Sequence, residues 1–114
     1  MERDQNGENV LRDLADGDLR VLSAVIRDPA RGRRASGLDD ATCQLLEIVA
    51  LAAVDAPPSS WFVHLGASPS VEVDRVVAAL VAVAPIVGTP KVVSAAENIL
   101  GATDFVDELE TERP

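Results

Sequence analysis

Hydrophobic and polar residues follow the period of an α-helix over much of this chain. The clearest helical segment begins at Asp39, a good N-cap residue, and runs to about Val54. Within it Asp40, Gln44 and Glu47 form a narrow polar stripe, and the second half is apolar on every side. The pattern therefore predicts a helix that is buried along most of its surface.

Three further helices are predicted after this one. Pro58 suits the first turn of a helix that continues to about Ala67. A helix capped by Ser70 is predicted to reach residue 84, where Pro85 interrupts the apolar run. The last helix is predicted over residues 90–101, after a threonine cap and a proline at the first helical position.

The two ends of the chain carry weaker patterns. Residues 8–27 predict one or two short amphipathic helices, which Asp28-Pro29 is predicted to end, and residues 30–37 predict a loop rich in small residues. The acidic tail, about residues 104–114, is expected to be partly disordered. The sequence thus predicts an all-α protein of about five to six helices. It also predicts a single domain over residues 1–114, with a core helical unit at about 38–101.

Two segments, residues 48–54 and 76–84, are apolar on every side. Such helices are hard to bury within 114 residues, because a small monomer leaves most of its helices half exposed. The simplest prediction is a homo-oligomer. A monomer in which these helices lie at the centre is the alternative, and the valine-rich runs also fit buried strands, although the alanine content and the caps favour helix.

Composition excludes several classes of function. The formal net charge of −9 argues against a nucleic-acid partner or an anionic membrane surface. No apolar run reaches the roughly 20 residues that a membrane span requires, and the polar first residues do not resemble a secretory signal. The lone Cys43 cannot form an internal disulfide, so the expected location is cytoplasmic. No metal-ligand cluster or phosphate-binding loop is visible, and no cofactor is expected.

The candidate chemistry centres on His64, the only histidine. Imidazole is the natural acid or base near neutral pH, but a helix histidine can equally have a structural role at a subunit contact. Trp61 either lines a pocket beside it or anchors the core. Cys43 fits a small buried hydrophobe better than a reactive thiol, since no basic residue adjoins it in sequence. The arginines of the predicted loop are either solvated or positioned to attract an anionic substrate, and they are Arg31, Arg33 and Arg34.

Three stretches resemble the carboxymuconolactone decarboxylase and alkylhydroperoxidase-D-like superfamily. Residues 38–45 resemble the family's Leu-Asp-x-x-Thr-Arg-Glu-Leu helix opening, and residues 60–65 resemble the helix that carries the family histidine, at His64. Residues 84–90 resemble the Ala-Pro-Tyr-x-Gly-x-Pro turn between the last two helices. The resemblance implies a small all-helical protein that forms trimers or hexamers.

The chain differs from the family pattern at the positions of the family's reactive residues. The peroxidase members carry a Cys-x-x-Cys motif at the positions held here by Pro57 and Ser60, so a thiol peroxidase is not expected. The family's opening glutamate falls on Gln44, a neutral residue that can only bind substrate, and Glu47 one turn later is predicted to partner His64 as the catalytic pair.

The resemblance therefore implies a divergent, non-redox member of the family. It would bind a small organic acid or lactone and perform proton-transfer or lyase chemistry through His64 and Glu47, with Trp61 and Gln44 binding the substrate. The alternative is a non-catalytic oligomeric helical scaffold or binding module. A closed pocket around Trp61 and His64 would favour an enzyme, and side chains filling that volume would favour a scaffold.

Overall fold

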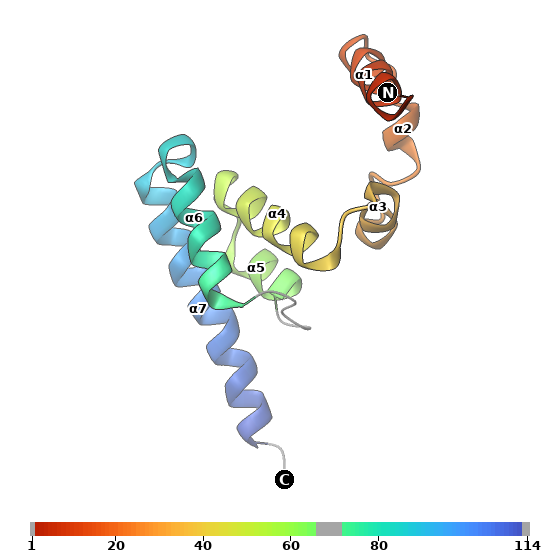
Figure 1. Cartoon of the computed structure of the whole chain (residues 1–114). Helices are drawn as coiled ribbons and strands as arrows, with labels where there is room; N and C mark the ends of the chain where they lie inside the picture. Colours follow the sequence, from red (N-terminus) through yellow and green to blue (C-terminus); the bar gives the residue numbers. More distant parts are fainter. Residues whose placement is uncertain (1, 66–71, 113–114) are drawn as a thin grey trace. The chain divides into compact units, whose positions relative to one another are not determined.

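The computed structural model describes residues 2–65 and 72–112, and within them the side chains of residues 7–65 and 72–103. This part of the chain is all-helical and contains no strand, which confirms the predicted all-α class (Figure 1). It forms seven helices where about five to six were predicted: α1 (Glu2–Ala15), α2 (Arg20–Ser23), α3 (Pro29–Ser36), α4 (Asp40–Ala53), α5 (Pro58–Leu65), α6 (Val73–Val87) and α7 (Thr89–Glu112).

The chain divides into two compact units. Unit 1 spans residues 1–38 and contains α1 to α3, and unit 2 spans residues 39–114 and contains α4 to α7. A compact unit need not be a separate domain, so the single domain over residues 1–114 stays a prediction. Unit 2 begins at Asp39, and the core helical unit at about 38–101 also stays a prediction.

Unit 2 is a four-helix arrangement around a small core. α5 packs mainly on α7 and α4 mainly on α6, while α6 and α7 also contact each other (Figure 1). Trp61, Ile48, Ala52 and Ala95 are each only 1% exposed, and Leu65 and Leu80 complete the interior. Alanine at the contact points lets helix backbones approach closely, which is how a chain with 3% aromatic residues still closes a core.

Helix α4 begins as its sequence predicts. Asp39 is the N-cap in extended backbone conformation, and its carboxylate accepts a hydrogen bond from the Thr42 hydroxyl. The helix ends at Ala53, followed by Asp55 with a positive φ of 50°. That turn reverses the chain so that α5 starts at Pro58, the proline predicted for the first helical turn.

The boundaries of α6 and α7 differ from the prediction. α6 begins after an N-cap at Glu72, and the predicted cap Ser70 lies outside the described residues. Pro85 does not end α6, because it lies in the last turn and the amide of Gly88 still bonds to the carbonyl of Ala84 at 2.9 Å. Gly88, with φ 96° and ψ 146°, is the residue that stops the helix.

The prediction that the last helix ends at Gly101 is wrong, because helix α7 continues to Glu112. A glycine inside a helix costs only about 0.5–1 kcal/mol relative to alanine, which is too little to stop a helix whose neighbouring residues favour it. Residues 104–112 are consequently helical, where a partly disordered acidic tail was expected.

In unit 1, the loop predicted over residues 30–37 is instead helix α3. The sequence Asp28-Pro29 was interpreted as the end of a helix, but it is a beginning: the Asp28 carboxylate accepts a hydrogen bond from the Arg31 amide at 3.2 Å, and Pro29 is the first helical residue. Gly37 closes the helix with a left-handed φ of 73°.

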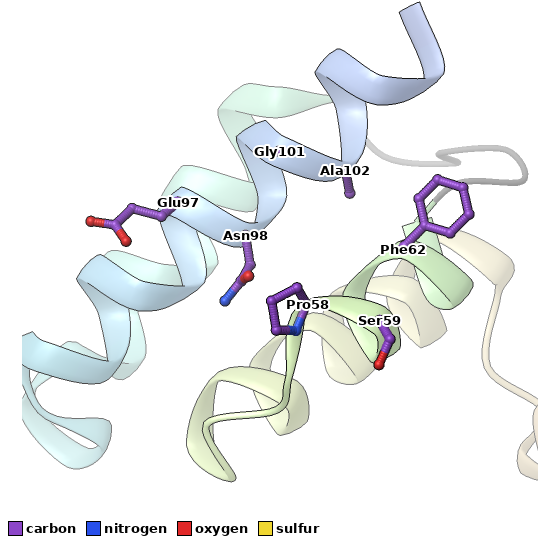
Figure 2. Close-up of a pocket in the computed structure, with 7 residues that line it drawn as sticks. All are labelled: Pro58, Ser59, Phe62, Glu97, Asn98, Gly101 and Ala102. Carbon is purple, nitrogen blue, oxygen red and sulfur yellow. The ribbon is translucent and has the colours of Figure 1, made fainter. Parts of the chain in front are cut away.

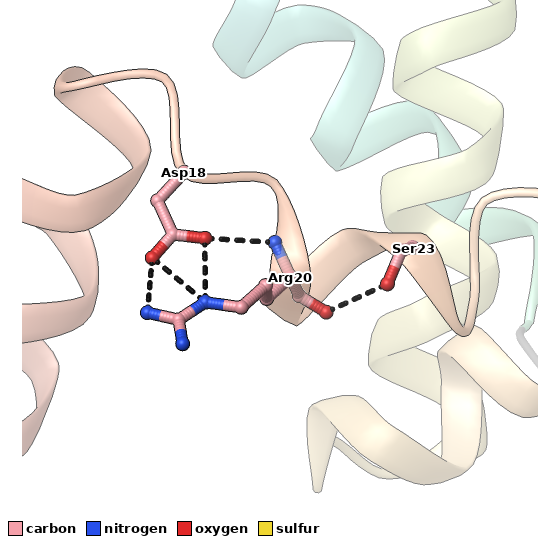
Figure 3. A network of polar contacts seen from close by, with 3 residues as sticks. All are labelled: Asp18, Arg20 and Ser23. Carbon is pink, nitrogen blue, oxygen red and sulfur yellow. Dashed lines mark hydrogen bonds and ion pairs between the residues drawn. The ribbon is translucent and has the colours of Figure 1, made fainter.

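Local polar contacts hold the rest of unit 1. The Arg20 guanidinium donates to both carboxylate oxygens of Asp18, at 2.6 to 3.0 Å, and the Arg20 amide donates to the same carboxylate at 3.1 Å (Figure 3). In α1, Arg12 pairs with Glu8 one turn away at 2.6 Å. Each of these contacts joins residues that are close in sequence.

Candidate functional site

The structure brings His64 and Glu47 together. Glu47 lies near the middle of α4 and His64 in the last turn of α5, and the distance from His64 Nδ1 to Glu47 Oε1 is 3.8 Å. That separation is longer than a hydrogen bond and within the range of an ion pair when the imidazole is protonated. The two side chains are 34% and 25% exposed, so solvent and small molecules can reach the pair.

The α4–α5 hairpin is what positions this pair. Asp55 and Ala56 reverse the chain between the two helices, and the burial of Ile48, Trp61 and Leu65 fixes how α5 is rotated against α4. A carboxylate beside one imidazole nitrogen orients the ring and favours a proton on that nitrogen, which leaves Nε2 to exchange a proton with a bound molecule. The predicted contact between Glu47 and His64 is present, while their catalytic roles stay predictions.

Trp61 lies in the core. It is 1% exposed, and its indole N–H donates to the carbonyl of Ala56 at 3.2 Å, so its single donor is used inside the protein. Of the two interpretations of Trp61, the structure shows the core anchor. Its predicted contact with substrate stays a prediction.

Gln44 is buried, whereas Glu47, one turn later on α4, is partly exposed. Gln44 is 4% exposed and lines a cavity of about 200 Å³ together with Glu72, the N-cap of α6, and Thr103 of α7. Neither His64 nor Glu47 lines that cavity. The structure therefore does not bring Gln44 into one cavity with the catalytic pair, and its role in binding substrate stays a prediction.

A larger cavity of about 470 Å³ opens between α5 and α7 (Figure 2). It is lined by Pro58, Ser59, Phe62, Glu97, Asn98, Gly101 and Ala102. None of these residues was selected from the sequence as a candidate. The one sequence feature that pointed to this cavity is Gly101, a glycine inside an otherwise helical pattern, and it was interpreted as the end of the helix.

The remaining candidates do not form a second site. Cys43 is buried at 7% exposure, and among the described residues no group of three or more His, Cys, Asp or Glu side chains is placed to hold a metal ion. Arg31, Arg33 and Arg34 belong to α3 of unit 1. Within the described part of the chain, no helix is both long enough and apolar enough to span a bilayer.

The fold and the site define a small all-α protein with a partly exposed histidine–glutamate pair between two helices of its core unit. Comparison with protein-family models, with curated proteins and with solved structures gives no match for this chain. The family resemblance therefore depends on the residues of the three stretches alone.

Proposed function

We propose that the chain is a divergent relative of the carboxymuconolactone decarboxylase superfamily that binds a small organic acid or lactone and transfers a proton through His64. The observation that carries this proposal is the 3.8 Å approach of Glu47 to His64 Nδ1. Two residues 17 positions apart on different helices meet at a partly exposed position of a unit whose other polar side chains are mostly on the surface.

In this proposal His64 is the acid and base, and Glu47 is a positioning residue. Loss of a substrate carboxylate as CO₂ would leave an electron pair on carbon, and protonated His64 would deliver a proton to that carbon through Nε2. The Glu47 carboxylate, 3.8 Å from Nδ1, would hold the ring so that Nε2 is left for the substrate. General acid catalysis of this kind typically contributes about 10²- to 10⁴-fold in rate and needs no redox partner.

A thermal-shift screen of small lactones and mono- and dicarboxylic acids tests the proposal. A compound that binds the native state raises the melting temperature, and the rise should disappear in His64→Ala. Glu47→Gln should weaken it, whereas the matched control Asp74→Asn, an exposed carboxylate at the start of α6, should leave it unchanged. Turnover assays on the same compounds follow. A compound turned over equally by wild type and His64→Ala would remove His64 from the mechanism.

The exposed face of α6 supports a second candidate, a homo-oligomeric scaffold without catalytic activity. Val73, Val77 and Val81 follow one another at four-residue spacing and are 75%, 52% and 67% exposed, and Ile86 is 87% exposed. A row of exposed valines on one helix face is typical of an interface between protein chains.

Sedimentation of wild type and two lysine variants tests this candidate. The full chain should sediment as a trimer or hexamer, and Val77→Lys should dissociate it, because a charge buried in an apolar interface is costly. Val54→Lys, at an exposed valine after α4, is the matched control and should keep the wild-type size. A wild type that sediments as a monomer at every concentration would contradict the oligomer.

A further inference from the structure

The cavity between α5 and α7 has the properties of a ligand site separate from the histidine–glutamate pair. Its volume of about 470 Å³ is within the range of about 300–1,000 Å³ that small-molecule sites occupy. Phe62 and Ala102 lie on opposite sides of the gap in Figure 2, and Asn98 extends toward Pro58. Apolar walls with a few polar groups are typical of sites that bind a small organic molecule.

Gly101 keeps this cavity open. It lies inside α7, where alanine would form a more stable helix, and a Cβ built on it meets no atom within 4 Å. Its backbone conformation does not require glycine, because its φ is not in the left-handed region. Gly101 lines the cavity, so a side chain at this position would occupy the space that a ligand needs.

The polar groups of the cavity favour a cationic hydrogen-bond donor. The amide nitrogen of Asn98 donates to the carbonyl of Ser94 at 3.0 Å, and none of the described residues donates to its carbonyl oxygen. Among the described residues of the lining Glu97 is the one that is charged, and within the described part of the chain it has no basic partner. Both groups accept hydrogen bonds from a ligand, and the carboxylate adds negative charge.

Phe62 gives the ligand an aromatic surface. Its side chain is 39% exposed on α5, in a protein that has only two phenylalanines. The face of an aromatic ring attracts a cation and also packs against an apolar group. A ligand that combines an ammonium group with an apolar body would contact the ring and the amide oxygen together. The Glu97 carboxylate is exposed and is directed away from Asn98 and Phe62 in Figure 2, so its side chain would rotate to reach the ammonium group.

From this arrangement we propose that the cavity between α5 and α7 binds a small amphipathic amine. Its ammonium group lies at Glu97 and the carbonyl oxygen of Asn98, and its apolar body lies against Phe62 and over Gly101. This site is distinct from the one proposed for organic acids, because none of its lining residues belongs to the histidine–glutamate pair. A positively charged ligand also complements a chain with a net charge of −9.

Titrations of the full-length ¹⁵N-labelled protein with three probes of similar shape test the ligand class. 2-Phenylethylamine should saturate and shift the amide signals of Phe62, Asn98 and Gly101. 2-Phenylethanol, which keeps the apolar body without the charge, should bind more weakly, and 3-phenylpropionate should not bind at these residues. Equal affinity for the amine and the carboxylate, or amine shifts confined to other residues, would overturn the proposal.

Glycine substitutions test the location. Gly101→Leu should weaken amine binding by about tenfold or more, because its side chain fills the cavity. Gly7→Leu is the matched control, since Gly7 also lies inside a helix and a Cβ there meets no atom within 4 Å. Its affinity should equal that of the wild type. Unchanged affinity in a folded Gly101→Leu protein would overturn the proposal.

Glu97→Gln removes the negative charge of the cavity without changing the size of the side chain. It tests the proposal even if Gly101→Leu does not fold. Its affinity for 2-phenylethylamine should fall toward that of 2-phenylethanol, while its affinity for the alcohol should not change. Circular dichroism confirms the fold of each variant. An unchanged preference for the amine in Glu97→Gln would overturn the proposal, and so would a wild-type cavity shown by intermolecular contacts to be filled by a second copy of the chain.

Discussion

None of the described side chains of unit 1 is buried, whereas unit 2 buries Trp61, Ile48, Ala52 and Ala95 almost completely. The helices of unit 1 are held by contacts between residues a few positions apart, such as Asp28 with Arg31. Those of unit 2 are held by side chains that come from four different helices. The same secondary structure therefore depends on local signals in one unit and on a shared core in the other.

The free energy of unfolding should therefore be more sensitive to substitution in unit 2 than in unit 1. The largest effect is expected at Trp61. Trp61→Ala should lower the free energy of unfolding by about 3–5 kcal/mol, because it leaves a large cavity in the core and removes the hydrogen bond to the carbonyl of Ala56. Leu11→Ala, at a leucine of unit 1 that is 68% exposed, should change it by about 0.5 kcal/mol or less. Urea denaturation followed by circular dichroism measures both. Equal losses would show that Leu11 is covered by something in solution.

The parts of the fold that the sequence predicted well are those that local signals specify. The start of α4 at Asp39 and the start of α5 at Pro58 follow from a cap and a helix-compatible proline. Asp28-Pro29 carries the same kind of signal, and it was assigned to the wrong end of a helix. A pair such as Asp28-Pro29 can mark either the end of one helix or the start of the next. The two cases can be told apart only when the helix that follows is also recognised.

The parts that the sequence did not predict depend on packing. Gly101 stops a helix only if nothing else stabilises it, and α7, which packs on α5 and α4, continues past this glycine. In the candidate site, the contact between Glu47 and His64 could be predicted from helical spacing and family resemblance. The cavity beside Phe62 could not, because it depends on how α5 and α7 are rotated against each other.

Two glycines with positive φ, Gly37 in unit 1 and Gly88 in unit 2, are expected to give losses of unfolding free energy of intermediate size when substituted. Gly88, with φ 96° and ψ 146°, has a conformation that is essentially restricted to glycine, so Gly88→Ala should cost about 1–3 kcal/mol. Gly37, with φ 73° and ψ 3°, lies in the left-handed region that other residues tolerate at about 1–2 kcal/mol. Chemical denaturation compares the two variants. A Gly37→Ala loss larger than that of Gly88→Ala would contradict the assigned conformations.

The cap of α3 tests whether unit 1 is locally specified. Asp28→Ala should destabilise α3 by about 0.5–2 kcal/mol, because the Arg31 amide loses its acceptor. Asp28→Asn should retain most of the stability, since asparagine caps about as well as aspartate. Hydrogen exchange of the α3 amides measures this local loss, while the amides of α4 should be unaffected. Faster exchange in α4 as well would show that the two units unfold together.

The smallest expected effect concerns two carboxylates near the surface, Asp18 in unit 1 and Asp39 in unit 2. Hydrogen bonds from the Arg20 side chain hold the pKa of Asp18 below its ordinary value, and the hydrogen bond from the Thr42 hydroxyl does the same for the pKa of Asp39. A carboxylate whose pKa is lower in the folded state stabilises that state above its unfolded pKa. This stabilisation is lost as the pH falls through the folded pKa.

Carbon-detected NMR titration of the two aspartates measures these pKa values directly. Arg20→Gln should raise the pKa of Asp18 toward its ordinary value and leave that of Asp39 unchanged, and Thr42→Val should have the reverse selectivity. Because Asp39 is exposed and Asp18 is partly exposed, each interaction should be weak and should act only within its own short segment. A variant that shifted both pKa values would show that the two carboxylates are coupled. That result would contradict the view that unit 1 depends on local contacts and unit 2 on its own core.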